Sequence, residues 1–205
     1  MAKLKWKGGA LVAPVPPAMI SCMGEDKKPN IITVAWTGIL CTHPPKTYIS
    51  VRPQRHSYPL IRESGEFVIN LTTKDLVRAA DFCGMKTGKK VDKFKECRLT
   101  PEFDEDDGFS CPAIAESPMS ILCKVAEIVP LGSHDMFIAD VVGIRVDESL
   151  IDESGKLRLD KAGLAAFAHG EYFELGKKLG NFGFSVVKKK KKPTGTAKPT
   201  GKSEK

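Results

Sequence analysis

The alternation of hydrophobic and polar positions predicts a chain built mainly of β-strands. Four short segments, 18–23, 31–37, 47–51 and 66–71, are rich in Ile, Val, Thr and aromatic residues, which favour strands. Polar residues at 25–30 separate the first two of these segments, and such a separation is typical of a hairpin turn.

Two longer apolar segments, 119–129 and 136–146, are separated by a short sequence that contains proline and glycine. This arrangement predicts a long β-hairpin. With about six strands joined largely by hairpins, the chain is expected to fold as an antiparallel barrel or sandwich.

A few helices are expected between and after the strands. The hydroxyl of Ser57 can cap the first helix, and Gly65 can end it. A second helix is expected to follow Thr72 and to end near Gly84. A third is expected over 170–180, where apolar residues recur at helical spacing.

Length and composition favour one soluble domain. The chain has 205 residues, of which 41% are hydrophobic and 28% charged, as in an ordinary globular protein. It has no long apolar run and no signal peptide at its N-terminus, so we expect a cytoplasmic protein without a membrane segment. The six cysteines form no C-x-x-C pair and no two histidines lie three or four residues apart. Reduced thiols and no metal site are therefore expected.

The formal net charge of +7 is concentrated at the C-terminus, where five lysines occupy 188–192. We expect residues 188–205 to be a disordered lysine-rich tail, because they contain no large apolar side chain to bury. Residues 1–187 would then form the folded domain. The tail can be a solubilising extension, or it can bind acidic surfaces or nucleic acid loosely. Nucleic-acid binding by the nearly neutral body is not expected.

Two glycine-containing basic segments do not fit a nucleotide-triphosphate loop. The segment 84–90 has three residues between its glycines, and the segment 195–203 has five. The phosphate loop needs four intervening residues, a preceding strand and a following helix. Both segments are therefore rejected as sites of this kind.

The segment 33–37 has small side chains on one face. In a strand, Thr33, Ala35 and Thr37 point to the same side. This face can let a flat ring approach the backbone, or it can simply face solvent.

Two basic loops are candidates for binding an anion. The segment 51–57 places arginines, a histidine and a serine before the first predicted helix, and a helix N-terminus with nearby arginines suits a phosphate group. The segment 86–94 is a second basic loop. Each can also be an ordinary solvated loop. Together with the small-residue strand, they would suit a planar, anionic ligand.

Taken in order, these segments resemble the flavin reductase-like family, in particular the branch that contains flavoredoxin and the archaeal ferric reductase. The resemblance runs over most of the chain before the tail. It is carried by 29–38, 44–45, 50–57, 64–71, 83–84, 87–88, 91–94, the hairpin at 132–135 and the final segment 172–180.

The resemblance implies an antiparallel split β-barrel that binds FMN, usually as a homodimer. The residues implied at the flavin ring and ribityl chain are Thr33, Ala35, Trp36 and Thr37. Those implied at the phosphate side and the rest of the pocket are Ser50, Val51, Arg52, His56, Ser57, Tyr58, Asn70, Thr87 and Lys93. Cys41 and His134 match positions on the nicotinamide or substrate side and are the candidate catalytic residues. Many members have Ser-Gly-Arg where this chain has Thr87-Gly88-Lys89, and lysine supplies charge without a bidentate fork.

The function implied is an FMN-binding oxidoreductase that uses NADH or NADPH to reduce flavin, ferric iron or another acceptor. The alternative is an electron carrier that keeps FMN tightly bound and exchanges electrons with a protein partner. The chain has no G-x-G-x-x-G motif, so NAD(P)H would bind transiently over the flavin.

Overall fold

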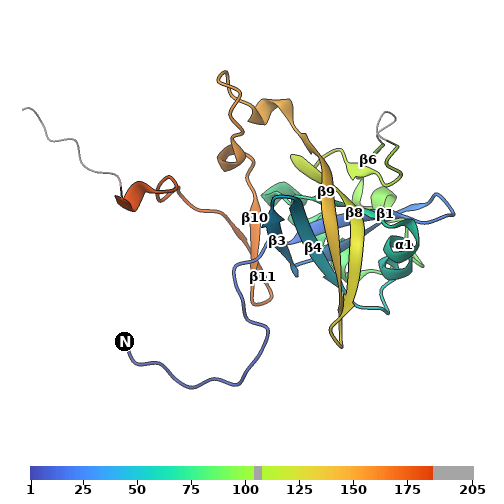
Figure 1. The fold of residues 1–205 in the computed structure, drawn as a ribbon, viewed down its shortest axis with the longest axis horizontal. Helices are drawn as coiled ribbons and strands as arrows, with labels where there is room; N and C mark the ends of the chain where they lie inside the picture. Colours follow the sequence, from blue (N-terminus) through green and yellow to red (C-terminus); the bar gives the residue numbers. More distant parts are fainter. Residues whose placement is uncertain (104–107, 187–205) are drawn as a thin grey trace, which may run out of the picture.

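The computed structural model describes residues 1–103 and 108–186, and its main element is a seven-stranded antiparallel sheet (Figure 1). The lysine-rich tail expected at 188–205 lies outside the described residues. The strand order is β2-β1-β5-β8-β9-β4-β3. These strands are β1 (Ala18–Met23), β2 (Pro29–Val34), β3 (Thr37–Thr42), β4 (Pro45–Val51), β5 (Glu66–Asn70), β8 (Met119–Pro130) and β9 (Asp135–Val146). The expected hairpins β1–β2 and β8–β9 are both present.

The sheet curls because its two edge strands are consecutive in the chain. β2 ends at Val34 and β3 begins at Thr37, so only Ala35 and Trp36 join the two edges. The backbone N–H of Ser50 on β4 donates to the carbonyl of Trp36 at 2.9 Å. This closure gives a split barrel and confirms the expected mainly β fold class. The single strand expected over 31–37 is wrong, because the chain crosses from one edge to the other in its middle.

The barrel interior is filled by alternate residues of its strands. Ile20 on β1, Ile49 on β4, Phe67 on β5 and Phe137 on β9 are fully buried in one cluster. Ile61 of α1 (Ser57–Ser64) completes this cluster from one end. Alternation along each strand places the next residues on the outer face.

Helices cover the outer face of β1 and β2. Met19 and Ile31 pack there against Ala80 and Cys83 of α2 (Val77–Met85) and Phe94 of α3 (Lys93–Cys97). α2 follows a short 3-10 turn, η1 (Lys74–Leu76). Burial on both faces makes β1 and β2 the rigid base from which neighbouring loops extend.

β6 (Pro101–Glu102) and β7 (Ala113–Ile114) form a small two-stranded sheet, and the chain just before and at β7 packs on β5 and β8. Phe109, Cys111 and Ala113 pack against Val68 and Leu122 there. This cover keeps Val68 of β5 and Leu122 of β8 from solvent.

The capping expected for the first two helices is partly wrong. Gly65 ends α1 with a φ of 68°, as expected for a glycine stop. Ser57 does not cap this helix, since its hydroxyl accepts a hydrogen bond from the Asn30 side chain. Thr72 also uses its hydroxyl elsewhere, donating to the carbonyl of Pro17.

The third expected helix is wrong. β10 (Ala165–Ala168) and β11 (Glu171–Glu174) form a hairpin instead, and residues 175–180 have no regular structure. His169 and Gly170 both have positive φ, 49° and 92°, as a tight two-residue hairpin turn requires. Tyr172 of the expected helical stripe packs against Phe167 within the hairpin, whereas Leu175 and Leu179 are 57% and 95% exposed.

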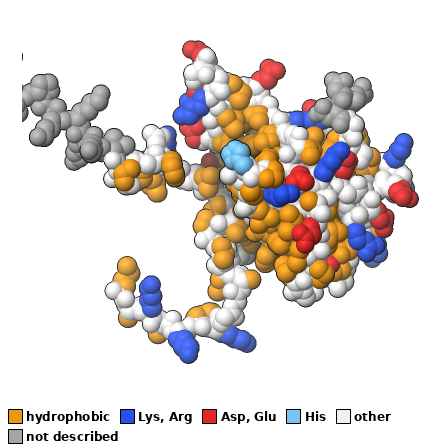
Figure 2. Space-filling model, in the orientation of Figure 1, with side chains coloured by type: hydrophobic (Ala, Val, Ile, Leu, Met, Phe, Trp, Pro, Cys, Tyr) orange, Lys and Arg blue, Asp and Glu red, His pale blue; other side chains and the backbone are white. Residues whose placement is uncertain are grey.

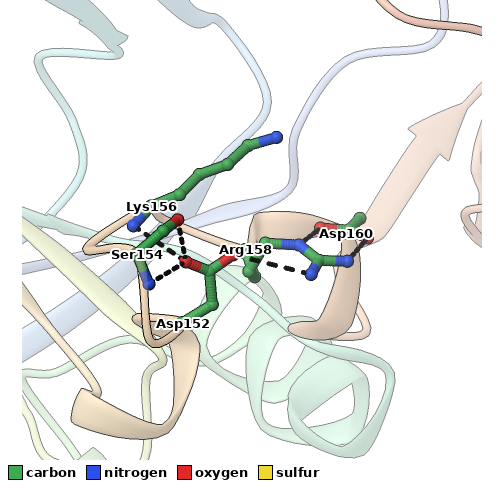
Figure 3. A network of polar contacts seen from close by, with 5 residues as sticks. All are labelled: Asp152, Ser154, Lys156, Arg158 and Asp160. Atoms are coloured by element: carbon green, nitrogen blue, oxygen red, sulfur yellow. Dashed lines mark hydrogen bonds and ion pairs between the residues drawn. The ribbon is translucent and has the colours of Figure 1, made fainter.

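The segment between β9 and β10 is held by a polar network around Asp152 and Arg158 (Figure 3). It contains two 3-10 turns, η2 (Glu148–Leu150) and η3 (Leu159–Lys161). Asp152 accepts from the backbone and hydroxyl of Ser154 and from the backbone of Lys156. Arg158 contacts Asp152 and donates two hydrogen bonds to Asp160, lowering the pKa of Asp160 to about 2. These contacts fix the local conformation of residues 152–160.

The N-terminal segment before β1 and the segment after β11 extend away from the barrel (Figure 1). The second of these ends in the 3-10 turn η4 (Phe184–Val186). In the described ranges, no helix has the length and apolar character needed to cross a membrane.

Candidate functional site

A cavity of about 470 Å³, called here the main cavity, opens at one end of the barrel. Its walls come from β2 and the β2–β3 connection, the end of β4, the last turn of α2, the tip of the β8–β9 hairpin and the β10–β11 hairpin. Seven of the residues expected at the site line it: Thr33, Ala35, Trp36, Ser50, Val51, Arg52 and His134. The fold therefore gathers residues from three separate parts of the sequence in one place.

A smaller cavity of about 110 Å³, called here the basic cavity, lies beside it. The two cavities share Ile32 and Arg55, so they are neighbours. Four other expected residues line the basic cavity: His56, Ser57, Thr87 and Lys93. Its cations are Arg55, Lys86 and Lys93, and no Asp or Glu is among its lining residues. It is therefore suited to an anionic group.

Lys93 brings a buried cation to the basic cavity. It is 3% exposed, and its ammonium donates to the carbonyls of Ile31 at 2.6 Å and Cys83 at 2.8 Å. Burial lowers the pKa of this lysine, because an ammonium loses hydration in the interior. An ammonium has three hydrogens, and these two carbonyls accept two of them.

Gly88 allows two chain segments to approach closely at the same cavity. A Cβ at this position would collide with the Asn30 side chain and lie 2.7 Å from the His56 ring. Asn30 is in turn fixed by its hydrogen bond of 2.7 Å to the hydroxyl of Ser57. Burial, and then the charges of Lys89 and Lys93, lower the pKa of His56. A neutral ring at pH 7 is the consequence.

His134 and Trp36 form one wall of the main cavity. Their rings stack with centroids 5.7 Å apart and an interplanar angle of 24°. Burial lowers the pKa of His134, and the charges of Arg52 and Arg55 lower it further. The imidazole can therefore accept a proton or a hydrogen bond at neutral pH. Its Nδ1 lies 2.9 Å from the Ser133 hydroxyl.

Four expected residues are not among those that line these two cavities. Thr37 donates to the carbonyl of Tyr48 at 2.6 Å and lines a larger apolar cavity of about 620 Å³, which shares Ala35, Trp36 and Phe167 with the main cavity. Tyr58 donates to Asp135 at 2.6 Å. Cys41 lies on β3, with its thiol 3.4 Å from the carbonyl of His43.

Asn70 is the fourth, and it is completely buried. Its amide donates to the carbonyl of Met19 and the hydroxyl of Ser21, and its oxygen accepts from the Ile114 N–H and the Ser120 hydroxyl. It joins β1, β5, β7 and β8 rather than facing a cavity.

Several cavity residues were missed by the sequence reasoning. Arg55 is shared by both cavities but is not among the site residues expected from the basic segment 51–57. Phe167 and Tyr172 line the main cavity from the β10–β11 hairpin, whereas the sequence pattern predicts a helix over 170–180. The dipeptide His169-Gly170 was the available sequence signal, because a residue followed by glycine favours a two-residue hairpin turn in which both have positive φ.

Comparison with known proteins identifies the family. The model of the flavin reductase like domain matches residues 12–176. The chain belongs to the flavin reductase-like family. Its cavities lie within the matched part of the chain, and all the residues that line them up to Tyr172 fall inside this range.

Solved structures show the same fold as this flavin reductase-like chain. Flavoredoxin of Desulfovibrio vulgaris (Miyazaki F) is 32% identical with a TM-score of 0.82, covering 90% of this chain and 99% of its own. Flavoredoxin from Methanosarcina acetivorans is 21% identical with a TM-score of 0.80, covering 91% and 100%. An FMN-binding protein from Thermus thermophilus, solved with 1-cyclohex-2-enone, is 22% identical with a TM-score of 0.72, covering 88% and 99%.

Proposed function

We propose that the chain binds FMN and acts as an oxidoreductase. The observation that carries the proposal is the junction of the main cavity and the basic cavity at Ile32 and Arg55. FMN needs both surroundings at once, because it joins a planar ring system to a phosphate. Family membership and the FMN-binding protein of similar fold support this choice.

The residues present fit the phosphate group. The basic cavity offers the Arg55 guanidinium, the Lys93 ammonium and the N-terminus of α1 at Ser57. Guanidinium and ammonium groups bind phosphate through charge-assisted hydrogen bonds, and a helix N-terminus adds free N–H groups. The missing side chain of Gly88 lets the Asn30 and His56 side chains pack closely against the loop that borders this cavity.

The main cavity fits the ring. Ala35 has a small side chain and lies at the connection that closes the barrel, so a flat ring can approach the backbone there. Trp36 and His134 would border the opposite edge, and Arg52 adds a positive charge. When bound, FMN supplies hydride and single-electron chemistry. The chain's own residues would bind it, orient it and stabilise negative charge on the reduced ring.

The proposed activity is reduction of flavin, ferric iron or another acceptor with NADH or NADPH. The neutral imidazole of His134 is the proposed proton-handling group on the substrate side. Cys41 is proposed at the same side from family resemblance, and its thiol is partly exposed on β3. A His134→Ala enzyme with unchanged turnover would remove the first of these roles.

The second candidate function is an electron carrier with tightly bound FMN and a protein redox partner. The 32% identity to a flavoredoxin, over nearly the whole of both chains, favours it. Anaerobic addition of NADH and NADPH to the FMN-loaded protein separates the two functions. Bleaching of the flavin absorbance by either nucleotide supports the reductase. A flavin that stays oxidised with both, and is reduced only by a protein donor, supports the carrier.

We also propose a homodimer. The two segments that extend from the barrel carry exposed apolar side chains, among them Trp6, Leu11, Phe182 and Phe184. Figure 2 shows further hydrophobic side chains over the face on which β4, β8 and β9 lie. Burying such surface in an interface is favourable. Sedimentation equilibrium of the full chain would give twice the chain mass, and the mass of a single chain would contradict the proposal.

A further inference from the structure

Two cysteines from different helices meet behind the basic cavity. Cys83 lies in the last turns of α2 and Cys97 ends α3, and their sulfur atoms are 3.9 Å apart. Cys83 is fully buried, whereas Cys97 is partly exposed to solvent. The pair therefore combines an accessible sulfur with a second sulfur already in contact with it.

The remaining thiols have different surroundings. Within 1–103 and 108–186, Cys22, Cys111 and Cys123 are buried with their sulfurs near backbone carbonyls. Cys41 also contacts a carbonyl and lies on β3. Contact between two sulfurs distinguishes the α2–α3 pair from these four.

We propose that Cys83 and Cys97 are a reversible redox site that forms an intramolecular disulfide when the protein meets hydrogen peroxide. The thiolate of Cys97 attacks the peroxide, which breaks the O–O bond, gives the sulfenic acid of Cys97 and releases water after protonation. The thiol of Cys83 then attacks this sulfur. The S–S bond forms and the sulfenic hydroxyl leaves as a second water, so two cysteines lose two electrons and the peroxide gains them.

The surroundings set the order of these steps. Burial raises the pKa of both thiols, to about 12 for Cys83, while the Lys93 ammonium favours their thiolate forms. Because the thiolate is the reactive species, the more accessible Cys97 reacts first and the reaction speeds up with rising pH. Cys83 is protected from the oxidant by burial and reacts only with the sulfur beside it.

The disulfide would tie together the segment that builds the basic cavity. It closes the loop from Cys83 to Cys97, which contains Thr87, Gly88 and Lys93. Lys93 already donates to the carbonyl of Cys83, so the bond would fasten a contact that exists in the reduced protein. A disulfide that closes a loop of this length is expected to lower the equilibrium constant for unfolding by up to about a hundredfold.

The test uses the full reduced chain, treated with hydrogen peroxide, alkylated under denaturing conditions and digested without reductant. We expect mass spectrometry to find one linked peptide pair containing Cys83 and Cys97, two hydrogens lighter than the thiols and separated by dithiothreitol. The link should form faster at pH 9 than at pH 7. Recovery of Cys83 as a free thiol beside sulfinic or sulfonic Cys97, or a link from either residue to another cysteine, would overturn the proposal.

Thermal melting supplies a second readout with matched variants. Peroxide should raise the Tm of the wild-type protein and of Cys41→Ser, and dithiothreitol should reverse the rise. Cys97→Ser should show no rise, and its circular dichroism before treatment reports whether it folds. An equal rise in Cys97→Ser would show that the stabilisation comes from elsewhere and would contradict the proposed bond.

Discussion

Replacing Asn70 with alanine tests whether this residue holds the fold together or contacts the cofactor. Family resemblance implies that Asn70 completes the flavin pocket, but its side chain is buried between strands and bonded within the protein. The two roles predict different losses. A structural residue lowers stability and leaves the cofactor affinity of the folded protein unchanged, whereas a pocket residue lowers the affinity.

The expected loss of stability follows from the groups left behind. Truncation strands the N–H of Ile114, which donates to the Asn70 oxygen at 2.9 Å, and the carbonyl of Met19 loses a donor at 3.0 Å. A buried group without its partner costs about 1–3 kcal/mol. The hydroxyls of Ser21 and Ser120 also lose a partner but can rotate, so the two backbone groups give most of an expected loss of about 3 kcal/mol in the free energy of unfolding.

Urea unfolding of the FMN-free protein measures this loss. With a slope of about 2 kcal/mol/M, the midpoint should fall by about 1.5 M in Asn70→Ala. Asn181→Ala is the matched control, because Asn181 is exposed and such surface changes stay within about 0.5 kcal/mol. A midpoint equal to that of the control would refute the structural reasoning. A normal midpoint with a weakened FMN affinity would assign Asn70 to the pocket instead.

Three further changes test the basic cavity. Lys93→Met should weaken FMN binding, measured by calorimetry, by about thirtyfold, which is the equivalent of one charged hydrogen bond of about 2 kcal/mol. Lys95 is exposed on the same helix, so Lys95→Met should bind FMN normally. Equal FMN affinities of the two variants would contradict the role of the Lys93 ammonium. Gly88→Ala should also weaken FMN binding, because its Cβ collides with neighbouring side chains, and Gly176→Ala in open space is its control. Burial and nearby lysines lower the pKa of His56 from 6.5, so the unfolded chain takes up a proton more readily and stability is lost as the pH falls through about 6.5. The drop in urea midpoint between pH 7.5 and pH 5.5 should be smaller in His56→Gln, and an unchanged drop would contradict this assignment.

Strands that carry a continuous apolar pattern were predictable from the sequence. β1, β5, β8 and β9 lie close to their expected ranges, because each carries a continuous apolar pattern bounded by turn residues. The barrel closure was not predictable in the same way. Residues 31–37 read as one strand, and the break at Ala35 and Trp36 depends on pairing of the two halves with β1 and β4, which are far apart in the sheet.

The hairpin of β10 and β11 shows a second limit. Tyr172, Leu175 and Leu179 recur at helical spacing, but a helix needs a surface on which to bury such a stripe. Leu175 and Leu179 are both exposed, and the chain forms a hairpin through the positive φ of His169 and Gly170. Periodicity alone therefore predicted the wrong element.

The candidate site was predictable as loops but not as a three-dimensional arrangement. Charge and helix position pointed to 51–57 and 86–94, and the fold brings residues of both to one cavity. Nothing local in the sequence shows that Arg55 faces both cavities or that Asn70 faces neither. Such distinctions depend on which side of a strand or loop the barrel closure turns inward.

The most direct test of the central claim is a titration of the FMN-free full chain with FMN, in which binding is measured by calorimetry and by flavin fluorescence. The same titration is carried out on a matched pair of variants, Arg55→Ala and Arg78→Ala, of which Arg78 is exposed. The account predicts saturable binding of one FMN per chain, marked weakening in Arg55→Ala and normal affinity in Arg78→Ala. Riboflavin, which lacks the phosphate, should bind the wild-type protein more weakly than FMN and should not distinguish the two variants. Absence of FMN binding to the folded wild-type chain, or FMN and riboflavin bound equally well, would contradict the assignment of the two cavities.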